Sequence, residues 1–360
     1  MSTSYAPASP RPATRRATMR AAVFVTPGRI ELQERPIPEI GPTDALLRVT
    51  TTTICGTDVH ILKGEYPVAP GRVVGHEPVG VIEALGSAVT GYQVGQRVVA
   101  GAITPCGQCY ACLGGSSAQC GGRALGGWRM GNTIDGCQAD YVRIPDATAN
   151  LAPIPDDLTD EQVLMCPDIM STGFGGAESG QVRIGDVVAV FAQGPIGLCA
   201  TAGARLRGAS RIITVDSVPA RIAISKHLGA EMVIDFTKRD PVAAIMELTD
   251  GRGVDAVIDC AGGPLLGASI ECLAVGGTLV SLGAHAGSHE EIDLWRLILR
   301  SCSLVGSARG TATEIRRVVE LAAAGALAPA IAGSFPLAEA GAAHAALESR
   351  DVYGKLVLVP

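Results

Sequence analysis

The stretch that decides the fold is Asp186-Val-Val-Ala-Val-Phe-Ala-Gln-Gly-Pro-Ile-Gly197, near the middle of the chain. Its apolar run predicts a buried strand, and the residues that follow have the apolar spacing of a helix. The turn between them matches the glycine fingerprint of dinucleotide-binding folds, except that Ala192 replaces the first glycine. Gly194 would let a pyrophosphate approach the backbone, and Gly197 would let the helix pack on the strand. Pro195 and Ile196 open this helix, whose free N–H groups would face the phosphates.

The same pattern, a strand-like segment followed by a helix-like one, continues on the C-terminal side of this turn. Strand-like apolar runs alternate with stretches of helical length, and the six runs cover residues 186–192, 211–216, 231–235, 254–259, 278–282 and 303–305. Helical spacing is visible over 196–206 and 220–228, and further elements are expected at 314–324 (helix) and 355–359 (strand). Such alternation predicts a parallel sheet covered on both faces. Six strands make a complete doubly wound dinucleotide fold.

The second strand-like run ends in Asp216, 24 residues after Ala192. An acid at this position can accept hydrogen bonds from both adenosine ribose hydroxyls, whereas a 2′-phosphate would meet a like charge. We therefore expect NAD rather than NADP as the cofactor. Arg221, five residues further on, is expected against the adenine ribose. The alternative is that Asp216 only caps a helix or lies on the surface.

Residues 19–168 have a different sequence pattern, with short apolar runs broken by Gly and Pro about every ten residues. This pattern predicts an irregular, β-rich domain. The first 18 residues are rich in Ser, Thr, Pro, Ala and Arg, and we expect a disordered N-terminal extension there. The expected fold class is therefore α/β, with an irregular β-rich domain and a doubly wound Rossmann sheet.

Composition excludes several classes of protein. A chain of 360 residues with 47% hydrophobic and 18% charged residues is globular and predicts two domains, or three small ones. Its longest apolar runs are far shorter than the roughly 18 residues of a membrane span. A net charge of −6 without a Lys/Arg run argues against nucleic-acid binding. No secretory signal is visible, so the cytoplasm is expected, where the eleven cysteines would be reduced or metal-bound.

Four of these cysteines, Cys106, Cys109, Cys112 and Cys120, lie within fifteen positions. Short C-x-x-C steps bring thiolates around one ion, and a Cys₄ tetrahedron is the closed kind of zinc site. We expect a structural zinc here. An iron–sulfur cluster and idle buried thiols are the alternatives.

Two further polar clusters are Cys55-Gly-Thr-Asp-Val-His60 and Gly75-His76-Glu77-Pro-Val-Gly80, with Gly86 six residues on. A catalytic zinc needs three protein ligands and one open position. Cys55 and His76 are suitable types, although composition alone does not pair them. With the four-cysteine loop and the dinucleotide turn, in this order, the chain resembles the zinc-dependent medium-chain alcohol dehydrogenases over nearly all of residues 19–360.

The resemblance implies that Cys55 and His76 ligate the catalytic zinc. The family's third ligand precedes a Ser/Thr-Thr-Gly turn by three positions, which here is Asp168 before Ser171-Thr172-Gly173. Many members have cysteine there, whereas an aspartate is similar to the bacterial secondary-alcohol (isopropanol-type) enzymes and to some formaldehyde dehydrogenases. Glu77 either approaches the zinc during ligand exchange or only tunes its field.

The resemblance also implies roles around the zinc. Thr57 resembles the hydroxyl of the family's proton relay, and His60 the imidazole that passes the proton on. Asp58 is expected to orient His76. A helix cap at Thr57 and a surface histidine at His60 are the alternatives. Trp128, in a segment similar to the isopropanol-type subgroup, is expected either to form a wall of the substrate pocket or to serve packing alone.

For the cofactor, the resemblance implies Thr172 beside the nicotinamide and Lys355 near the phosphates. It also implies a GroES-like catalytic domain over residues 19–168 and 311–360, and a Rossmann domain over 169–310. Two zincs per chain, NAD and a tetramer complete the expectation. The chain departs from many isopropanol-type members, which prefer NADP and lack the four-cysteine lobe.

The expected activity is reversible hydride transfer between a small, secondary alcohol and NAD, giving a ketone or aldehyde. The alternatives are a formaldehyde-, aldehyde- or polyol-oxidising relative with the same zinc, and a non-catalytic nucleotide-binding scaffold.

Overall fold

The computed structural model describes residues 17–284, 286–308, 310–327, 330–349 and 354–360. Up to residue 16, the expected N-terminal extension lies outside the described residues. The described chain contains one parallel sheet, one larger sheet that is mainly antiparallel, and one hairpin. None of the helices within the described residues has the length and apolar character needed to cross a membrane.

The parallel sheet has six strands in the order β10-β9-β8-β11-β12-β13. Their bounds are β8 (Val187–Phe191), β9 (Arg211–Val215), β10 (Met232–Ile234), β11 (Val254–Asp259), β12 (Leu273–Ser281) and β13 (Ser303–Gly306). The order reverses between β8 and β11, which is where doubly wound folds bind their ligands. The six predicted strands are confirmed. β12 begins earlier than expected because Leu273 already pairs with Val254, ahead of an irregularity in the register.

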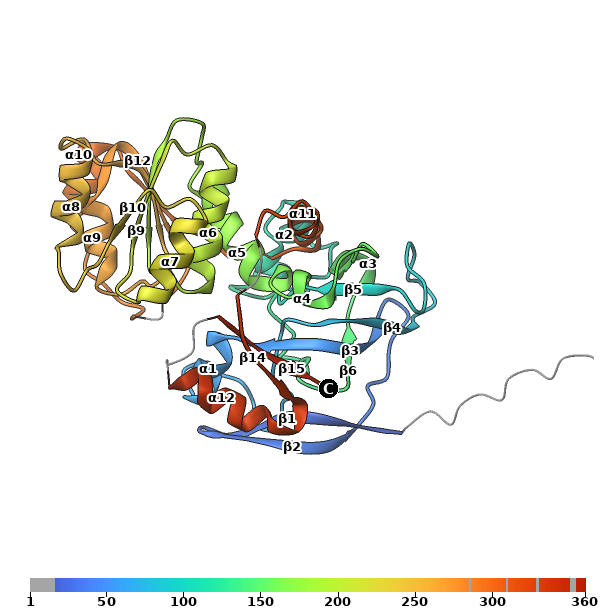
Figure 1. Ribbon diagram of the computed structural model, residues 1–360. Helices are drawn as coiled ribbons and strands as arrows, with labels where there is room; N and C mark the ends of the chain where they lie inside the picture. The colour runs from blue at the N-terminus through green and yellow to red at the C-terminus, as the bar shows by residue number, and fades with distance from the viewer. Residues whose placement is uncertain (1–16, 285, 309, 328–329, 350–353) are drawn as a thin grey trace, which may run out of the picture.

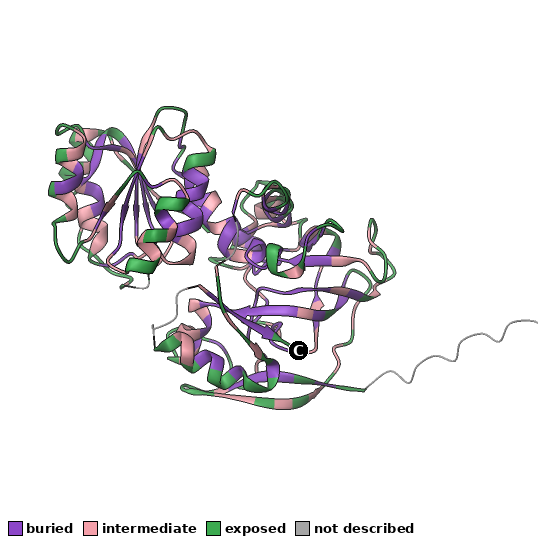
Figure 2. Cartoon of the chain, in the orientation of Figure 1, coloured by how far each residue is buried: buried purple, intermediate pink, exposed green. Residues whose placement is uncertain are grey.

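Helices cover both faces of this sheet (Figure 1). They are α6 (Pro195–Leu206), α7 (Pro219–His227), α8 (Pro241–Leu248), α9 (Leu265–Glu271) and α10 (Leu294–Arg300). The central strands β8, β9 and β11 are almost wholly buried, whereas the outer faces of the helices are exposed (Figure 2). This burial on both sides explains why the strands read as continuous apolar runs rather than as alternating ones.

The second sheet has the order β14-β15-β3-β4-β5-β7, and β6 also pairs with β3. Its strands are β3 (Ala45–Ile54), β4 (Val79–Leu85), β5 (Arg97–Ala100), β6 (Tyr141–Ile144), β7 (Leu151–Pro153), β14 (Ile331–Pro336) and β15 (Lys355–Val359). The hairpin joins β1 (Thr18–Thr26) to β2 (Arg29–Pro36). β15 runs antiparallel to β3 with Leu356 opposite Ile54, so the C-terminal strand returns to the N-terminal half of the chain.

Short helices surround this second sheet. They are α1 (Gly56–Leu62), α2 (Tyr110–Leu113), α3 (Ala147–Asn150), α4 (Asp160–Val163), α11 (Ala312–Ala323) and α12 (Ala340–Glu348), with the 3₁₀ segments η1 (Ser117–Gly122) and η3 (Leu337–Glu339). A π-helical turn, η2 (Cys166–Met170), leads into α5 (Ser171–Ser179). The mixed α/β class with a parallel sheet is confirmed, whereas the expected domain bounds stay a prediction.

Helix α5 packs on α6 and so joins the two sheets. The contact is close at Gly173, where a Cβ atom would lie 2.5 Å from the Cβ of Cys199 and 2.7 Å from the carbonyl oxygen of Ile196. Around it, buried residues of α4, η2, α6 and α11 form one continuous apolar cluster. Glycine at this position therefore lets α5 and α6 approach each other. The same packing holds the π-helical turn η2 beside α6.

Candidate metal centre

Three separate segments bring together the expected ligands. Cys55 follows β3 and is the N-cap of α1, His76 lies just before β4, and Asp168 lies in the π-helical turn. Asp168 Oδ2 is 3.6 Å from His76 Nε2 and 3.9 Å from Cys55 Sγ. Together with Glu77, each of these residues offers one ligand atom within 4.8 Å of the others.

This donor set fits zinc. Bonds of about 2.0–2.3 Å at tetrahedral angles place neighbouring ligand atoms about 3.3–3.5 Å apart, so the structure needs a contraction of only a few tenths of an ångström. A thiolate and a carboxylate also balance the two charges of the ion. Without the ion, burial lowers the pKa of His76, but hydrogen bonding to Asp168 and Cys55 outweighs burial and raises it well above the ordinary value.

Asp58 lies behind His76, on the side away from the cluster. One of its carboxylate oxygens, Oδ2, accepts a hydrogen bond from the Cys55 N–H at 2.9 Å. The other, Oδ1, lies 3.7 Å from His76 Nδ1, and neither atom has a hydrogen-bond partner among the described residues. Asp58 thus faces the ring nitrogen opposite the ligand atom, as in carboxylate–histidine–metal sites.

Glu77 forms a buried ion pair on the other side of the cluster. Its Oε2 accepts hydrogen bonds from Lys355 Nζ at 2.5 Å and from Thr53 Oγ1, while its Oε1 has no partner among the described residues. Burial raises the pKa of Glu77, and the charge of Lys355 lowers it. Lys355 was expected near the cofactor phosphates. The structure brings its ammonium group to Glu77, and a contact with phosphate stays a prediction.

The expected relay residues lie on α1. Thr57 Oγ1 is 3.6 Å from Cys55 Sγ, and His60 Nδ1 pairs with the Glu65 carboxylate. Because Cys55 is the N-cap of α1 and Asp58 closes its capping box, the capping alternative for Thr57 is wrong. His60 is 20% exposed, so it reaches solvent without being a fully exposed surface residue.

An aromatic wall lies beside His76. The Trp128 ring is edge-on to His76, with centroids 6.5 Å apart, and to Tyr66, with centroids 5.3 Å apart. Tyr66 in turn meets His60 at 5.8 Å. Burial, and then the charge of Cys55, raises the pKa of the Tyr66 phenol. Sequence reasoning missed Tyr66, because nothing in its local spacing indicates that its ring meets Trp128.

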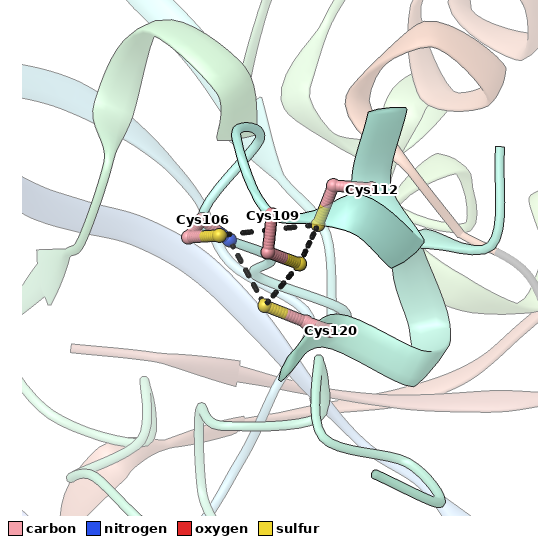
Figure 3. A group of neighbouring side chains, drawn as sticks. All are labelled: Cys106, Cys109, Cys112 and Cys120. Carbon is pink, nitrogen blue, oxygen red and sulfur yellow. Dashed lines mark hydrogen bonds between the residues drawn. The ribbon is translucent and has the colours of Figure 1, made fainter. Parts of the chain in front are cut away.

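The four-cysteine cluster is a second metal-binding group (Figure 3). Cys109 Sγ lies 3.4 Å from Cys112 Sγ and 4.0 Å from Cys120 Sγ, and Cys106 Sγ lies 4.0 Å from Cys112 Sγ. Zinc–sulfur bonds of about 2.3 Å in a tetrahedron place sulfurs about 3.8 Å apart, so this cluster fits zinc as well. The N–H of Gly121 donates to Cys109 Sγ and, with the N–H of Cys112, lowers the pKa of Cys109 to about 6.

The dinucleotide turn has the expected geometry. A Cβ on Gly194, the N-cap of α6, would meet nothing within 4 Å, so its backbone is open to a ligand. A Cβ on Gly197 would lie 1.8 Å from the Ala192 carbonyl oxygen, which explains the glycine there. Ala192 adopts a left-handed conformation with φ +65°, which ordinarily favours glycine. Pro195 and Ile196 form the first turn of α6.

Asp216 follows β9 and holds the same turn. Its Oδ2 accepts the N–H of Gln193 at 2.7 Å and its Oδ1 accepts that of Val218 at 2.8 Å. Arg221 Nη1 lies 3.7 Å from Oδ2. Thr172, expected beside the nicotinamide, donates a hydrogen bond to Asp168 Oδ1 at 3.1 Å. The structure thus links a cofactor candidate directly to a metal-ligand candidate.

Comparisons with known proteins agree with this geometry. Two family models match the chain: "Alcohol dehydrogenase GroES-like domain" over residues 41–156 and "Zinc-binding dehydrogenase" over residues 195–324. An alcohol dehydrogenase of Cupriavidus necator is 62% identical over 284 residues, which cover 75% of this chain and 78% of that protein. An NADP-dependent isopropanol dehydrogenase of Thermoanaerobacter brockii is 35% identical over 281 residues, 78% of this chain and 79% of that protein.

Solved structures give the same result. The alcohol dehydrogenase TADH from Thermus sp. ATN1 superposes with a TM-score of 0.87 at 32% identity, covering 95% of this chain and 99% of that chain. The resemblance drawn from the motifs and the expectation of alcohol and ketone oxidoreduction are confirmed. Both halves of the molecule match one enzyme family, and the chain belongs to the zinc-dependent medium-chain alcohol dehydrogenases.

Proposed function

We propose that this dehydrogenase oxidises small secondary alcohols to ketones, reversibly, with NAD as hydride acceptor and a zinc ion held by Cys55, His76 and Asp168. The observation that carries the proposal is the convergence of one thiol, one imidazole and one carboxylate in a buried site. The ion, when bound, supplies a Lewis acid that favours loss of the alcohol proton. Bound NAD would supply the hydride acceptor, so that the hydrogen on the carbinol carbon would leave with its electron pair as the carbon–oxygen double bond forms.

The hydroxyl proton leaves through the side chains of α1. The Thr57 hydroxyl, 3.6 Å from Cys55 Sγ, stands at the edge of the ligand set, where it would accept this proton while releasing its own toward His60. His60, paired with Glu65 and partly exposed, passes it to water. Thr172 and Asp58 hold the two ligand side chains that they contact, so the site is oriented before the substrate enters.

Small secondary alcohols are favoured by the aromatic wall. The ring of Trp128 lies beside His76 and that of Tyr66 lies beside Trp128, so the alkyl groups of a substrate would meet apolar side chains there. The similarity to the T. brockii protein named an isopropanol dehydrogenase supports the same class. A formaldehyde-, aldehyde- or polyol-oxidising activity is the alternative with the same zinc. A scaffold role is disfavoured, because a scaffold has no need of a buried thiol, imidazole and carboxylate set, whose desolvation cost a bound metal ion would offset.

NAD is supported by the carboxylate of Asp216 at the end of β9, which would repel a 2′-phosphate. NADP is the second candidate, because the guanidinium group of Arg221 lies 3.7 Å from that carboxylate and could pair with a phosphate. Relatives named NADP-dependent favour the same candidate. We expect NAD to be the better cofactor, and Asp216→Ala to reduce the preference for NAD. Equal activity with both cofactors, unchanged in the variant, would refute the assignment.

The deciding experiment combines metal analysis with NADH formation on 2-propanol, ethanol, formaldehyde and sorbitol. We expect two zincs per chain, one at each cluster, and fastest turnover of 2-propanol. Cys55→Ser should lose one zinc and the activity. Cys166→Ala is the matched control, because this buried thiol lies in the same turn as Asp168 but contacts Met170 Sδ at 3.9 Å instead of the ligand set. Turnover that survives in Cys55→Ser would sink the proposal.

Self-association is supported by one surface. Helix α10 exposes four large apolar side chains, each more than 60% exposed: Leu294, Trp295, Ile298 and Leu299. Beside them β13 is the last strand of the parallel sheet among the described residues. Apolar patches and open sheet edges both favour interfaces. We therefore expect a homo-oligomer, with the tetramer suggested by the family, and Leu299→Lys should lower the mass measured by light scattering.

The thiols support the expected compartment. All eleven cysteines are unbridged in the structure. This many unbridged cysteines, whether free or bound to metal, is typical of the reducing cytoplasm, which we keep as the proposed location.

A further inference from the structure

A buried chain of polar groups runs from the metal ligands to helix α12. Behind His76, the Asp58 carboxylate accepts a hydrogen bond from Gln138 Nε2 at 3.3 Å. Gln138 Oε1 lies 2.9 Å from Nε2 of His344, which α12 carries. All four side chains are almost completely buried. Gln138 and His344 are 206 residues apart in sequence, and neither belongs to a motif.

We propose that Gln138 and His344 are positioning residues of the metal site: through Asp58 they hold the His76 ring with its Nε2 facing the ion. This inference rests on the proposed function, because it assumes that Cys55, His76 and Asp168 bind zinc.

Donor and acceptor chemistry sets the direction of this chain. An ionised carboxylate only accepts hydrogen bonds, so the Gln138 atom that faces Asp58 must be the NH₂ group. The atom that faces His344 is then the amide oxygen, which requires a hydrogen on Nε2 of His344. Burial lowers the pKa of His344, which favours the neutral ring. In its Nε2–H form, the neutral ring is the donor that this amide oxygen needs.

Packing alone does not explain these residues. An amide and an imidazole cost free energy when they leave water, and two apolar side chains would fill the same space without that cost. The cost is not fully offset here, because His344 Nδ1 has no hydrogen-bond partner among the described residues. What the polar pair adds is a fixed orientation for Asp58.

Gln138 is also tied to the backbone next to His76. Its N–H donates to the Val74 carbonyl at 2.9 Å, and its own carbonyl accepts the Ala22 N–H at 2.8 Å. A Cβ on Gly75, the residue before His76, would lie 2.5 Å from Gln138 Cγ. The side chain that orients Asp58 therefore also defines the backbone that carries the ligand.

The test measures how fast zinc leaves the site, independently of turnover. Zinc-loaded enzyme is mixed with the chelator 4-(2-pyridylazo)resorcinol, and the phase that Asp168→Asn accelerates is assigned to the proposed catalytic site. We expect His344→Phe and Gln138→Met to accelerate this phase on the order of 3–10-fold, the size of one lost orienting hydrogen bond. The double variant should be no faster than Gln138→Met, because both changes break one chain.

A rescue and a packing control separate positioning from structure. His344→Gln puts an NH₂ group where the ring Nε2–H was, so zinc release should return to within about twofold of the unmodified enzyme. Leu347→Ala loosens the packing of the same helix without touching the polar chain. It should lower the thermal midpoint without changing the release of zinc. If His344→Phe fails to fold, Gln138→Met and His344→Gln carry the test.

The outcomes distinguish the two proposals. If the unmodified enzyme shows no zinc phase that responds to Asp168→Asn, the proposed function is wrong. If it shows that phase and both His344→Phe and Gln138→Met release zinc at the unmodified rate, only the positioning role is overturned. An acceleration by Leu347→Ala equal to that of His344→Phe would also overturn it, because general loosening would then account for the effect.

Discussion

The ion pair of Lys355 and Glu77 predicts a large effect for Lys355→Met. The two side chains are only 3% and 1% exposed, and Nζ lies 2.5 Å from Oε2. Methionine fills the space of the aliphatic stem but removes the charge. Glu77 then keeps Thr53 as its single hydrogen-bond donor among the described residues, beside the negative charge of Asp168. Breaking a buried pair from one side typically costs about 3–5 kcal/mol.

Glu77 can limit this cost by taking up a proton. Burial already raises its pKa, and Lys355 works against burial, so the variant raises the pKa of Glu77 further. In the folded variant Glu77 then binds a proton more tightly than in the unfolded chain. The stability of the variant therefore falls as the pH rises through the folded-state pKa of Glu77. Its loss of stability relative to the unmodified enzyme is larger at pH 8 than at pH 5.

The assay is the thermal midpoint of zinc-loaded enzyme at pH 5 and pH 8. A cost near 3 kcal/mol corresponds to a decrease of about 6–12 °C at pH 8 for a folding unit of this size. Glu77→Gln combined with Lys355→Met removes both charges and should recover at least half of the loss. A single variant within 1–2 °C (roughly 0.5 kcal/mol) of the unmodified enzyme at pH 8, or a double variant no better than the single one, would refute the reasoning.

Three further predictions follow from other parts of the molecule. Gly75→Ala should cost about 2–4 kcal/mol of stability and weaken zinc binding at the proposed site of His76, because φ is +93° and the new Cβ would lie 2.9 Å from a backbone nitrogen. Thermal melting and metal analysis measure these effects. Gly28→Ala is the control: with φ +79° and open space around the new Cβ, it should cost only about 1–2 kcal/mol. Burial lowers the pKa of His344, so the unfolded chain binds a proton at this residue more readily than the folded one, and stability is lost as the pH falls below about 6.5. The thermal midpoint of His344→Gln should therefore decrease less between pH 7 and pH 5 than that of the unmodified enzyme. Equal decreases in the two proteins would contradict this. Cys109→Ser should lose one zinc per chain and lower the thermal midpoint by on the order of 5 °C while the other zinc remains bound, and a variant that keeps two zincs would speak against the four-cysteine site.

Local patterns made most of the fold predictable. The strand and helix alternation after residue 182 gave six parallel strands, because strands buried on both faces are continuous apolar runs. Dense local spacing also identified the four cysteines, whose thiols lie together. Cys55, His76 and Asp168 are far apart in sequence, and only the family resemblance paired them.

The contacts that sequence analysis missed depend on which distant segments the fold brings together. Lys355 reaches Glu77 across 278 positions because β15 lies antiparallel to β3. His344 reaches Gln138 because α12 covers the same sheet, and nothing in the spacing of either residue indicates a partner. Tyr66 is close to His60 in sequence, but only the fold shows that its ring meets Trp128.

The π-helical turn that carries Asp168 connects two binding events mechanically. The chain continues from Asp168 directly into α5, and α5 packs on α6 at Gly173. Helix α6 in turn begins at the dinucleotide turn. A dinucleotide that shifts the start of α6 would therefore also shift Asp168, the proposed zinc ligand, through the contact between α5 and α6. Coupling of this kind is reciprocal, so a chain loaded with metal should hold its nucleotide more tightly than a stripped one, and by the same factor the nucleotide should slow the escape of the metal.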